Sequence, residues 1–158
     1  PVLALLVLLP DRVLYSVQGA ARWLMRAAQF VGLLGFAGAL LVTDVGRFTG
    51  LKQAAAYLRG DPLPLPEPEL VILGMYRFTR HPLYFFSLLA LWSAPMMTVN
   101  TLWFNIAATL YFMVGSRVEE ERLVRIYGEE YRTYRRDVPW LIPLPPSRRR
   151  SGEAQAEP

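Results

Sequence analysis

The chain alternates between long uncharged runs and short segments that are rich in charge. Residues 82–116 contain no Asp, Glu, Lys or Arg over 35 positions, whereas 12 of the 21 residues from 117 to 137 are charged. A second uncharged run covers residues 27–43. A helix needs about 20 apolar residues to cross a bilayer. The pattern therefore predicts an all-α integral membrane protein with charges at the ends of its helices.

The run at residues 27–43 predicts a spanning helix that carries Gly32, Gly35 and Gly38 at helical spacing. Such small residues let a neighbouring helix approach closely. The apolar stretch Val2–Leu9 is too short to cross a bilayer by itself. We expect it to be what remains of a truncated first membrane segment.

The run at residues 82–116 is longer than one spanning helix requires, and Ala94-Pro95 interrupts it near its centre. The residue before a proline is disfavoured in a helix. We therefore predict a C-terminal helical hairpin of residues 82–95 and 98–116, which brings the expected number of membrane segments to about four. Pro82 suits the first helical position, with His81 as the cap.

A polar connector separates the predicted helix at residues 27–43 from the hairpin. It contains a short amphipathic piece at Leu51–Leu58, followed by the sequence DPLPLPEPE. Four prolines at every second position exclude a helix and favour extended backbone. We expect this part to lie as a rigid strap over the membrane face.

An amphipathic helix is predicted after the hairpin, at residues 117–136, with a bend at Gly128. Arg and Glu oppose its apolar stripe. The segment VPWLIPLPP at residues 138–146 is expected to lie extended on the membrane surface. The basic tail at residues 144–158 is expected to be disordered from Ser147 onward. The members of the stripe are Leu123, Tyr127, Tyr131 and Tyr134.

Composition narrows the chemistry that the chain can perform. The sequence has no cysteine, which excludes disulfides, thiolate metal sites and a cysteine nucleophile. It has one histidine, His81, so it lacks the HExxH motif and any His-rich metal cluster. We therefore expect no metal, and a Ser-His-Asp hydrolase is poorly supported.

The basic residues indicate topology rather than nucleic-acid binding. The net charge is +4, but the Arg residues flank apolar runs and no nucleic-acid motif accompanies them. In the predicted topology 3 basic residues lie on one side and 14 on the other. Because excess Arg and Lys mark the cytoplasmic side, the connector and the C-terminus are expected to share the cytoplasmic face.

Two charged motifs adjoin the hairpin: GMYRFTRHPLY at residues 74–84 before it and EEERL at residues 119–123 after it. Antiparallel packing would bring both to one cytoplasmic edge. Carboxylates there can meet the positive groups of a cationic, amphipathic cofactor, and aromatic faces can meet its sulfonium or base.

Each of these residues also has an ordinary structural interpretation. Arg77 and Arg80 can anchor the helix at lipid headgroups. His81 can be a helix cap with no further role. The tyrosines suit an interfacial belt. Glu119 and its neighbours can pair with arginines three or four residues further along one helix. The residues alone leave these alternatives open.

The motifs closely resemble those of the isoprenylcysteine carboxyl methyltransferase and phospholipid methyltransferase superfamily. The resemblance rests on RHPLY, the uncharged hairpin, EExxL, YGEEYxxYRRxVP and a final LIP, in that order, over Leu70–Pro143. GMYRFTRHPLY, WSAPMMT and VPWLIP are most similar to the bacterial branch that includes methanethiol S-methyltransferase. The resemblance implies an integral-membrane enzyme that uses S-adenosylmethionine.

The resemblance also implies a site within one methyltransferase-like domain at residues 1–143, whose catalytic part is residues 70–143. Glu119 can pair with the ammonium or the ribose hydroxyls of the cofactor. If the acceptor is a thiol, Glu120 and His81 are the candidates for accepting its proton. The implied cofactor-binding residues are Leu70, Val71, Tyr76, His81, Pro82, Tyr84 and Glu119.

One departure from the family bears on the acceptor. Prenylcysteine enzymes hold the substrate carboxylate with an arginine one helical turn before the cofactor-binding glutamate, and Gly115 occupies that position here. A small neutral thiol or another lipophilic acceptor, entering from the bilayer, is therefore favoured. The alternatives are an isoprenylcysteine carboxyl or phospholipid amine methyltransferase, and a non-catalytic accessory protein on the same scaffold. The expected location is the bacterial inner membrane.

Overall fold

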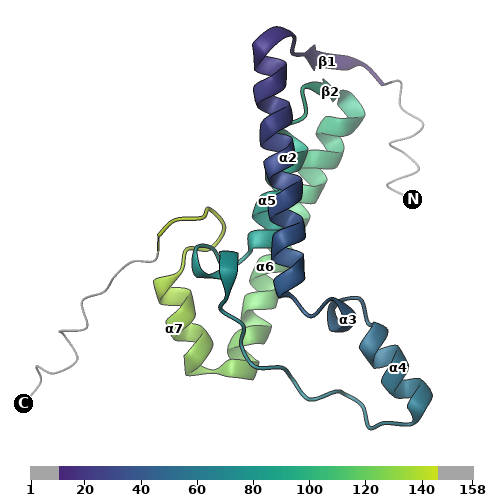
Figure 1. Ribbon diagram of the computed structural model, residues 1–158, viewed down its shortest axis with the longest axis vertical. Helices are drawn as coiled ribbons and strands as arrows, with labels where there is room; N and C mark the ends of the chain where they lie inside the picture. Colours follow the sequence, from purple (N-terminus) through teal and green to yellow (C-terminus); the bar gives the residue numbers. More distant parts are fainter. Residues whose placement is uncertain (1–10, 146–158) are drawn as a thin grey trace, which may run out of the picture.

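The computed structural model describes residues 11–145 and shows a mostly helical chain (Figure 1). The stretch Val2–Leu9 lies outside the described residues, as does the predicted basic tail from residue 146 onward. The elements in chain order are β1 (Val13–Ser16), α2 (Gly19–Val42), α3 (Val45–Phe48), α4 (Leu51–Arg59), the 3-10 helix η1 (Gly74–Arg77), α5 (Pro82–Trp92), β2 (Met96–Thr98), α6 (Val99–Tyr127) and α7 (Glu129–Asp137).

Helix α2 contains the predicted spanning segment but begins at Gly19, eight residues earlier than residue 27. Among residues 11–145 it is the one helix both long and apolar enough to cross a membrane, and α5 is a shorter apolar helix. Eleven residues of α5 rise about 16 Å, roughly half of a bilayer's hydrocarbon thickness. The length and composition of α2 agree with the predicted spanning helix, and the total number of spans stays a prediction.

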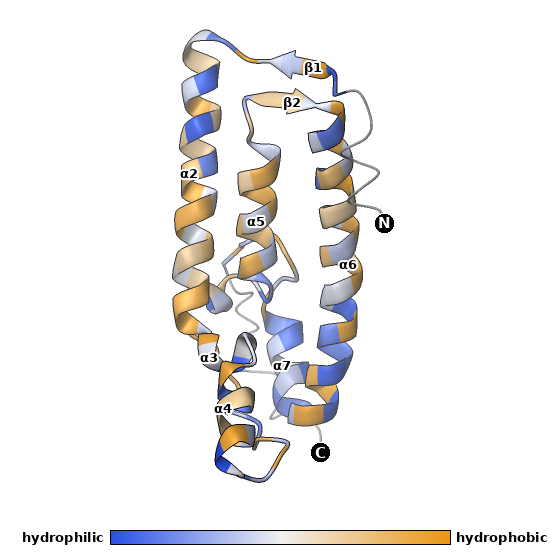
Figure 2. Cartoon of the chain, turned by 90° about the vertical axis from the view of Figure 1, so that its right-hand side faces the viewer, coloured by the Kyte–Doolittle hydropathy of each residue, from blue (hydrophilic) through white to orange (hydrophobic). Residues whose placement is uncertain are grey.

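The predicted close approach of two helices occurs between α2 and α5, which pack side by side (Figure 2). A Cβ added at Gly32 would lie 2.7 Å from the backbone nitrogen of Ala90, and one added at Gly35 would overlap the ring of Phe86. Gly38 differs, because its Cβ would meet open space. Two of the three predicted small positions therefore hold α5 against α2.

The hairpin is present, with three differences from the prediction. Its first helix, α5, ends at Trp92, and the turn contains a strand, β2, which pairs antiparallel with β1. The fold is therefore not purely helical. Its second helix does not end at residue 116, because no breaker follows, and α6 continues through the charged residues to Tyr127. Gly128, at a positive φ of 56°, separates α6 from α7.

The tyrosine stripe forms a small core where α6, α7 and the connector meet. Tyr131, Tyr134 and Val138 are buried there. The extended part of the connector crosses α6 at this place, and the hydroxyl of Tyr127 donates to the Pro68 carbonyl over 2.7 Å. The partly buried residues packed against this core are Leu70, Ile72, Leu123, Val124 and Tyr127.

Hydropathy divides the molecule along its length. The middle of α2 and most of α5 are hydrophobic, whereas α7 and the adjoining end of α6 are hydrophilic (Figure 2). Helices α3 and α4 form an arm that leaves the same end of the bundle (Figure 1). The RHPLY and EExxL motifs therefore lie where the apolar helices give way to the polar end.

Candidate active site

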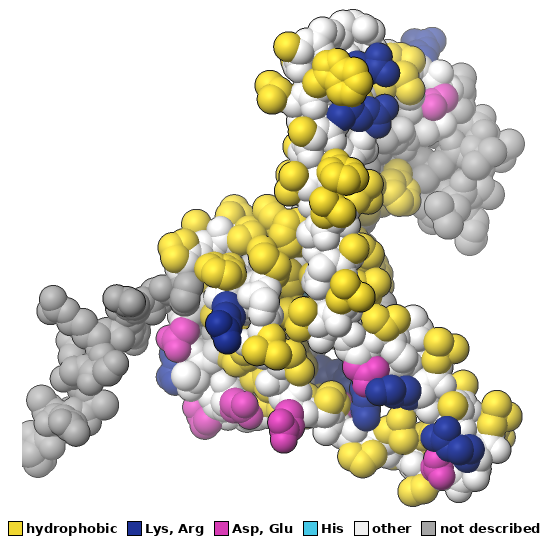
Figure 3. Space-filling view, in the orientation of Figure 1, with side chains coloured by type: hydrophobic (Ala, Val, Ile, Leu, Met, Phe, Trp, Pro, Cys, Tyr) yellow, Lys and Arg dark blue, Asp and Glu magenta, His cyan; other side chains and the backbone are white. Residues whose placement is uncertain are grey.

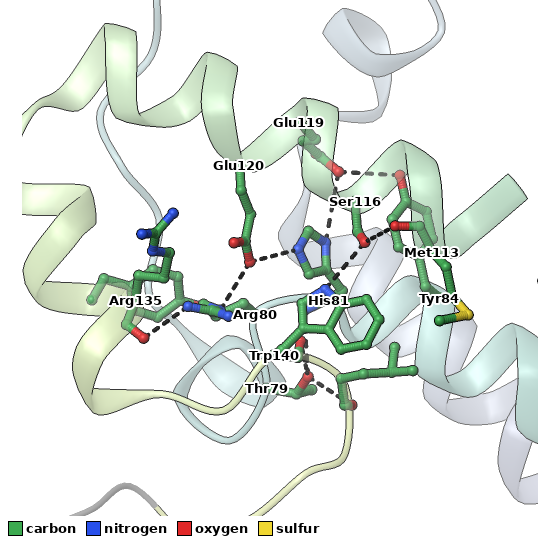
Figure 4. Close-up of polar contacts among 12 residues, drawn as sticks. Thr79, Arg80, His81, Tyr84, Met113, Ser116, Glu119, Glu120, Arg135 and Trp140 are labelled. Carbon is green, nitrogen blue, oxygen red and sulfur yellow. Dashed lines mark hydrogen bonds and ion pairs between the residues drawn. The ribbon is translucent and has the colours of Figure 1, made fainter. Parts of the chain in front are cut away.

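His81 is the centre of the candidate site (Figure 4). It occupies the N-cap position of α5, but its side chain makes no capping hydrogen bond to that helix. Its Nε2 lies 3.2 Å from Oε1 of Glu120, and its Nδ1 lies 3.7 Å from Oε2 of Glu119. The ring, in a residue only 6% exposed, is thus held between two carboxylates.

The two neighbouring glutamates have different surroundings because consecutive helical residues point about 100° apart. The Glu120 side chain is 10% exposed and faces His81 and Arg80, whereas the Glu119 side chain is 48% exposed. Burial alone would raise the pKa of Glu120, but the hydrogen bond with His81 and the charge of Arg80 outweigh it and lower that pKa. Glu120 is therefore held as a carboxylate, and Glu119 remains partly open to solvent.

Arg80 supplies the balancing positive charge. Its Nε lies 3.0 Å from Oε1 of Glu120, but the N–H is not aimed at the carboxylate, so this contact is a charge pair rather than a directed hydrogen bond. Its Nη1 donates to the Arg135 carbonyl over 2.7 Å. Burial lowers the pKa of Arg80, while Glu120 acts in the opposite direction. Arg80 thus joins the site to the end of α7.

Tyr84 connects the site to the hairpin. Its hydroxyl donates to Oε2 of Glu119 over 3.1 Å. Its ring stacks on His81, with centroids 5.3 Å apart, and on Phe112, with centroids 4.9 Å apart. These three nearly parallel rings form an aromatic stack next to the half-exposed carboxylate.

Tyr76 joins three parts of the chain near the site. Its hydroxyl lies 3.0 Å from Oγ1 of Thr43 at the end of α2. Its carbonyl accepts a hydrogen bond from the hydroxyl of Tyr134 over 2.7 Å. Burial raises the pKa of Tyr76, and the nearby charge of Glu119 raises it further. Tyr76 therefore lies between the end of α2 and the Glu119 edge.

The C-terminal segment fastens the RHPLY motif from the other side, a role that the sequence did not indicate. The Thr79 hydroxyl donates to the carbonyls of Trp140 and Leu141 over 3.1 and 2.8 Å. The Trp140 indole donates to the hydroxyl of Ser116 over 3.1 Å. Residues 138–145 thus pack on the chain just before α5, and the VPWLIP motif was the available signal for this contact.

The structure brings together four of the predicted site residues and separates two. His81, Tyr84, Glu119 and Glu120 form one connected network. Pro82 is buried at the first turn of α5, and Tyr76 lies within electrostatic reach of Glu119. Leu70 and Val71 lie on the connector, where Leu70 packs against the tyrosine core and Val71 is exposed.

Comparisons with known proteins agree with the motifs. Residues 27–130 match the sequence profile of a family described as phospholipid methyltransferase. The chain is 34% identical over 143 residues to methanethiol S-methyltransferase 2 of Bradyrhizobium diazoefficiens, covering 90% of this chain and 54% of that protein. It is 40% identical over 94 residues to methanethiol S-methyltransferase of Pseudomonas deceptionensis, covering 60% of this chain and 35% of that protein.

Another relative is named for a different activity. The chain is 38% identical over 80 residues to protein-S-isoprenylcysteine O-methyltransferase of Schizosaccharomyces pombe, covering 49% of this chain and 34% of that protein. The chain spans about half, or less, of the length of these three curated relatives. No solved structure matches it.

Proposed function

Because the chain belongs to the phospholipid methyltransferase family, we propose that it transfers a methyl group from S-adenosylmethionine to a small lipophilic acceptor at a membrane, with a methanethiol-like thiol as the favoured acceptor. The observation that carries this proposal is the network of His81, Glu119 and Glu120 at the polar end of the helices (Figure 4). Relatives named methanethiol S-methyltransferase support the choice of acceptor.

The residues present suit S-adenosylmethionine by their chemistry. Glu119 offers a half-exposed carboxylate that can accept hydrogen bonds from ribose hydroxyls or pair with an ammonium. The stacked rings of His81, Tyr84 and Phe112 offer aromatic surface to a base or a sulfonium. When bound, the cofactor supplies the reactive methyl group on its sulfonium.

The contacts favour His81 over Glu120 as the group that accepts the thiol proton. Glu120 already pairs with Arg80 and His81, and its pKa is lowered, which makes it a weak base. If Nε2 of His81 donates to Glu120, Nδ1 is left with a free lone pair on the Glu119 side. His81 then takes the proton at Nδ1, and Glu120 stabilises the resulting imidazolium.

The surroundings of Gly115 favour a neutral acceptor. A Cβ at this position would have no atom within 4 Å, so the helix is open there, and glycine offers no charge to hold a carboxylate. In this proposal the apolar helix α2 lies in the bilayer, and the site lies at the cytoplasmic face of a bacterial inner membrane. A lipophilic acceptor then enters from the bilayer and the polar cofactor from the cytoplasm.

Methyl transfer from labelled S-adenosylmethionine in membranes that contain the protein tests this function. Methanethiol, a farnesylcysteine analogue and extracted lipid are offered as acceptors. We expect labelled product from methanethiol, and loss of most activity in His81→Ala and Glu119→Ala. Glu121→Ala is the matched control, because Glu121 is an exposed acid of the same helix.

Two results would count against the whole proposal, and a third would count against the acceptor alone. Full activity in both His81→Ala and Glu119→Ala would place the site elsewhere. A protein that binds neither S-adenosylmethionine nor S-adenosylhomocysteine in a calorimeter would leave only the reading of a non-catalytic scaffold. Activity on farnesylcysteine or lipid without activity on methanethiol would keep the enzyme class and change the acceptor.

A further inference from the structure

The arm formed by α3 and α4 contains an arginine, Arg47, that forms no ion pair with another residue of the described chain. Asp44, the nearest acid, accepts the backbone N–H of Arg47 and pairs its other oxygen with the ammonium of Lys52. The guanidinium of Arg47 makes no hydrogen bond or ion pair with any residue from 11 to 145, and its Nε is buried. Because Asp44 is engaged with Lys52, the partly exposed guanidinium of Arg47 is suited to pair with an anion.

An unpaired acceptor lies next to this arginine. The side-chain nitrogen of Gln53 donates to the Arg47 carbonyl over 3.1 Å, which fixes the orientation of the amide. Its Oε1 is then buried and accepts no hydrogen bond from the described part of the chain. A buried acceptor that is left unpaired costs free energy. Arg47 and Gln53 together offer one free cation and one free acceptor.

The arm is joined to the candidate site through the end of α2. Thr43 ends α2 and lies 3.0 Å from the Tyr76 hydroxyl, and α3 begins two residues after Thr43. Tyr76 in turn lies near Glu119. Burial raises the pKa of the Tyr76 phenol, and the negative charge of Glu119 raises it further. Arg47 is therefore four residues along the chain from Thr43, the residue that contacts Tyr76.

Arg47 also lies within reach of the cytoplasmic end of α6. Burial and Glu67 raise the pKa of Tyr127, and the positive charges of Arg122 and Arg47 oppose them. Figure 3 shows a notch between the arm and the body of the molecule, with basic side chains along it. Glu119 and Tyr127 are eight residues apart on α6, a little over two helical turns, so their side chains point about 80° apart around that helix.

We propose that Arg47 and Gln53 bind the amino-acid end of S-adenosylmethionine, with the carboxylate at Arg47 and the ammonium at Oε1 of Gln53. This inference rests on the proposed function and deepens it, because it adds a second contact region to the cofactor site. A zwitterion matches both unpaired groups, whereas a phosphodiester, which has no O–H, would satisfy the arginine and leave the amide oxygen without a donor. Glu119 is then left for the ribose hydroxyls.

Calorimetry on the full chain in detergent tests the inference with two probes. S-adenosylhomocysteine carries the amino-acid end, and 5′-methylthioadenosine lacks it. In Arg47→Gln we expect the affinity for S-adenosylhomocysteine to fall on the order of tenfold or more, since a charge-assisted contact is lost. The affinity for 5′-methylthioadenosine should not change. Gln53→Met should have a smaller effect of the same kind.

Arg59→Gln is the matched control, because Arg59 lies on the same arm, is exposed and pairs with Asp61. It should leave both affinities unchanged. A second measurement needs no variant: the unaltered protein should bind decarboxylated S-adenosylhomocysteine on the order of tenfold more weakly than the intact compound. This comparison decides the question if the Arg47→Gln variant does not fold.

Three outcomes would overturn the inference. They are an equal loss of affinity for both probes in Arg47→Gln, no loss for either probe, and equal binding of the intact and decarboxylated compounds by the unaltered protein. If the unaltered protein binds neither S-adenosylhomocysteine nor 5′-methylthioadenosine, the proposed function itself fails. The two failures are therefore distinguishable.

Discussion

Nε2 of His81 lies 3.2 Å from Oε1 of Glu120, although 39 residues separate them in the chain. The contact joins the residue that precedes α5 to the polar end of α6. It also places the only histidine of the sequence in a nearly closed environment between two carboxylates. Both the stability of the fold and its dependence on pH should therefore depend on this pair.

Glu120→Gln should destabilise the protein far more than Glu119→Gln. The first change removes the counter-charge of two buried partners, Arg80 and His81, and breaking such a pair costs on the order of 3 kcal/mol. The second changes a half-exposed side chain, for which we expect less than about 1 kcal/mol. Thermal unfolding in detergent measures both, and equal losses would contradict this prediction.

The lowered pKa of Glu120 predicts how stability depends on pH. A carboxylate whose pKa is lower in the folded state adds stability above its unfolded pKa and loses it as pH falls through the folded value. The unfolded value is near 4.5. The unfolding temperature should therefore be flat around neutrality for this group and fall below about pH 5. Glu120→Gln should show a shallower fall, and parallel curves would contradict the assignment.

Gly35→Ala should loosen the contact between α2 and α5. The added Cβ would overlap the Phe86 ring, and overpacking of this kind costs roughly 1–3 kcal/mol. Gly38→Ala is the control on the same helix, since its Cβ meets open space, and it should be neutral or stabilising by up to about 1 kcal/mol. The unfolding temperatures of the two variants test this prediction. A larger loss of stability in Gly38→Ala than in Gly35→Ala would contradict the packing of α2 on α5.

Tyr84→Phe should weaken binding of S-adenosylhomocysteine less than Tyr84→Ala does. Phenylalanine keeps the stack on His81 and Phe112 and loses only the hydrogen bond that orients Glu119. That bond is worth about 1 kcal/mol, so the affinity should fall by at most roughly fivefold. Alanine removes both interactions. Calorimetry separates the two contributions, and identical affinities in both variants would show that the stack has no part in binding.

Trp140 and Ser116 should be energetically coupled. The hydrogen bond from the Trp140 indole to the Ser116 hydroxyl links residues 138–145 to α6. In a double-mutant cycle of Trp140→Phe and Ser116→Ala, we expect a coupling energy of about 1 kcal/mol in the free energy of unfolding. Additive effects of the two substitutions would mean that this link does not hold the C-terminal segment.

Most helical elements could be predicted, because each depends on local sequence. The uncharged run from residue 27 and Pro82 at the start of α5 indicated helices that the structure contains. The continuation of α6 past residue 116 was missed because a change from apolar to charged residues does not by itself end a helix. The pairing of β1 with β2 was missed because it joins segments about 80 residues apart.

The candidate site was predictable as a meeting of two motifs and not as a geometry. The hairpin, read from the sequence, required RHPLY and EExxL to approach each other. The resemblance gave Glu119 and Glu120 different roles, but their different burial follows from which side of α6 faces Arg80. The VPWLIP motif marked residues 138–143, but the hydrogen bonds of Trp140 with Thr79 and Ser116 could not be predicted, because they depend on the path of residues 138–145.

By itself the sequence determined the helices, the charged ends and the two motifs, because periodicity, prolines and charge act within a few residues of the chain. Only the tertiary structure decided which charged side chains form ion pairs and which charged side chains have no ion-pair partner. Arg80 pairs with Glu120, and Lys52 pairs with Asp44, so Arg47 is left without an ion pair within residues 11–145. Burial and pairing are properties of packed neighbours, and those neighbours are fixed only when the chain has folded.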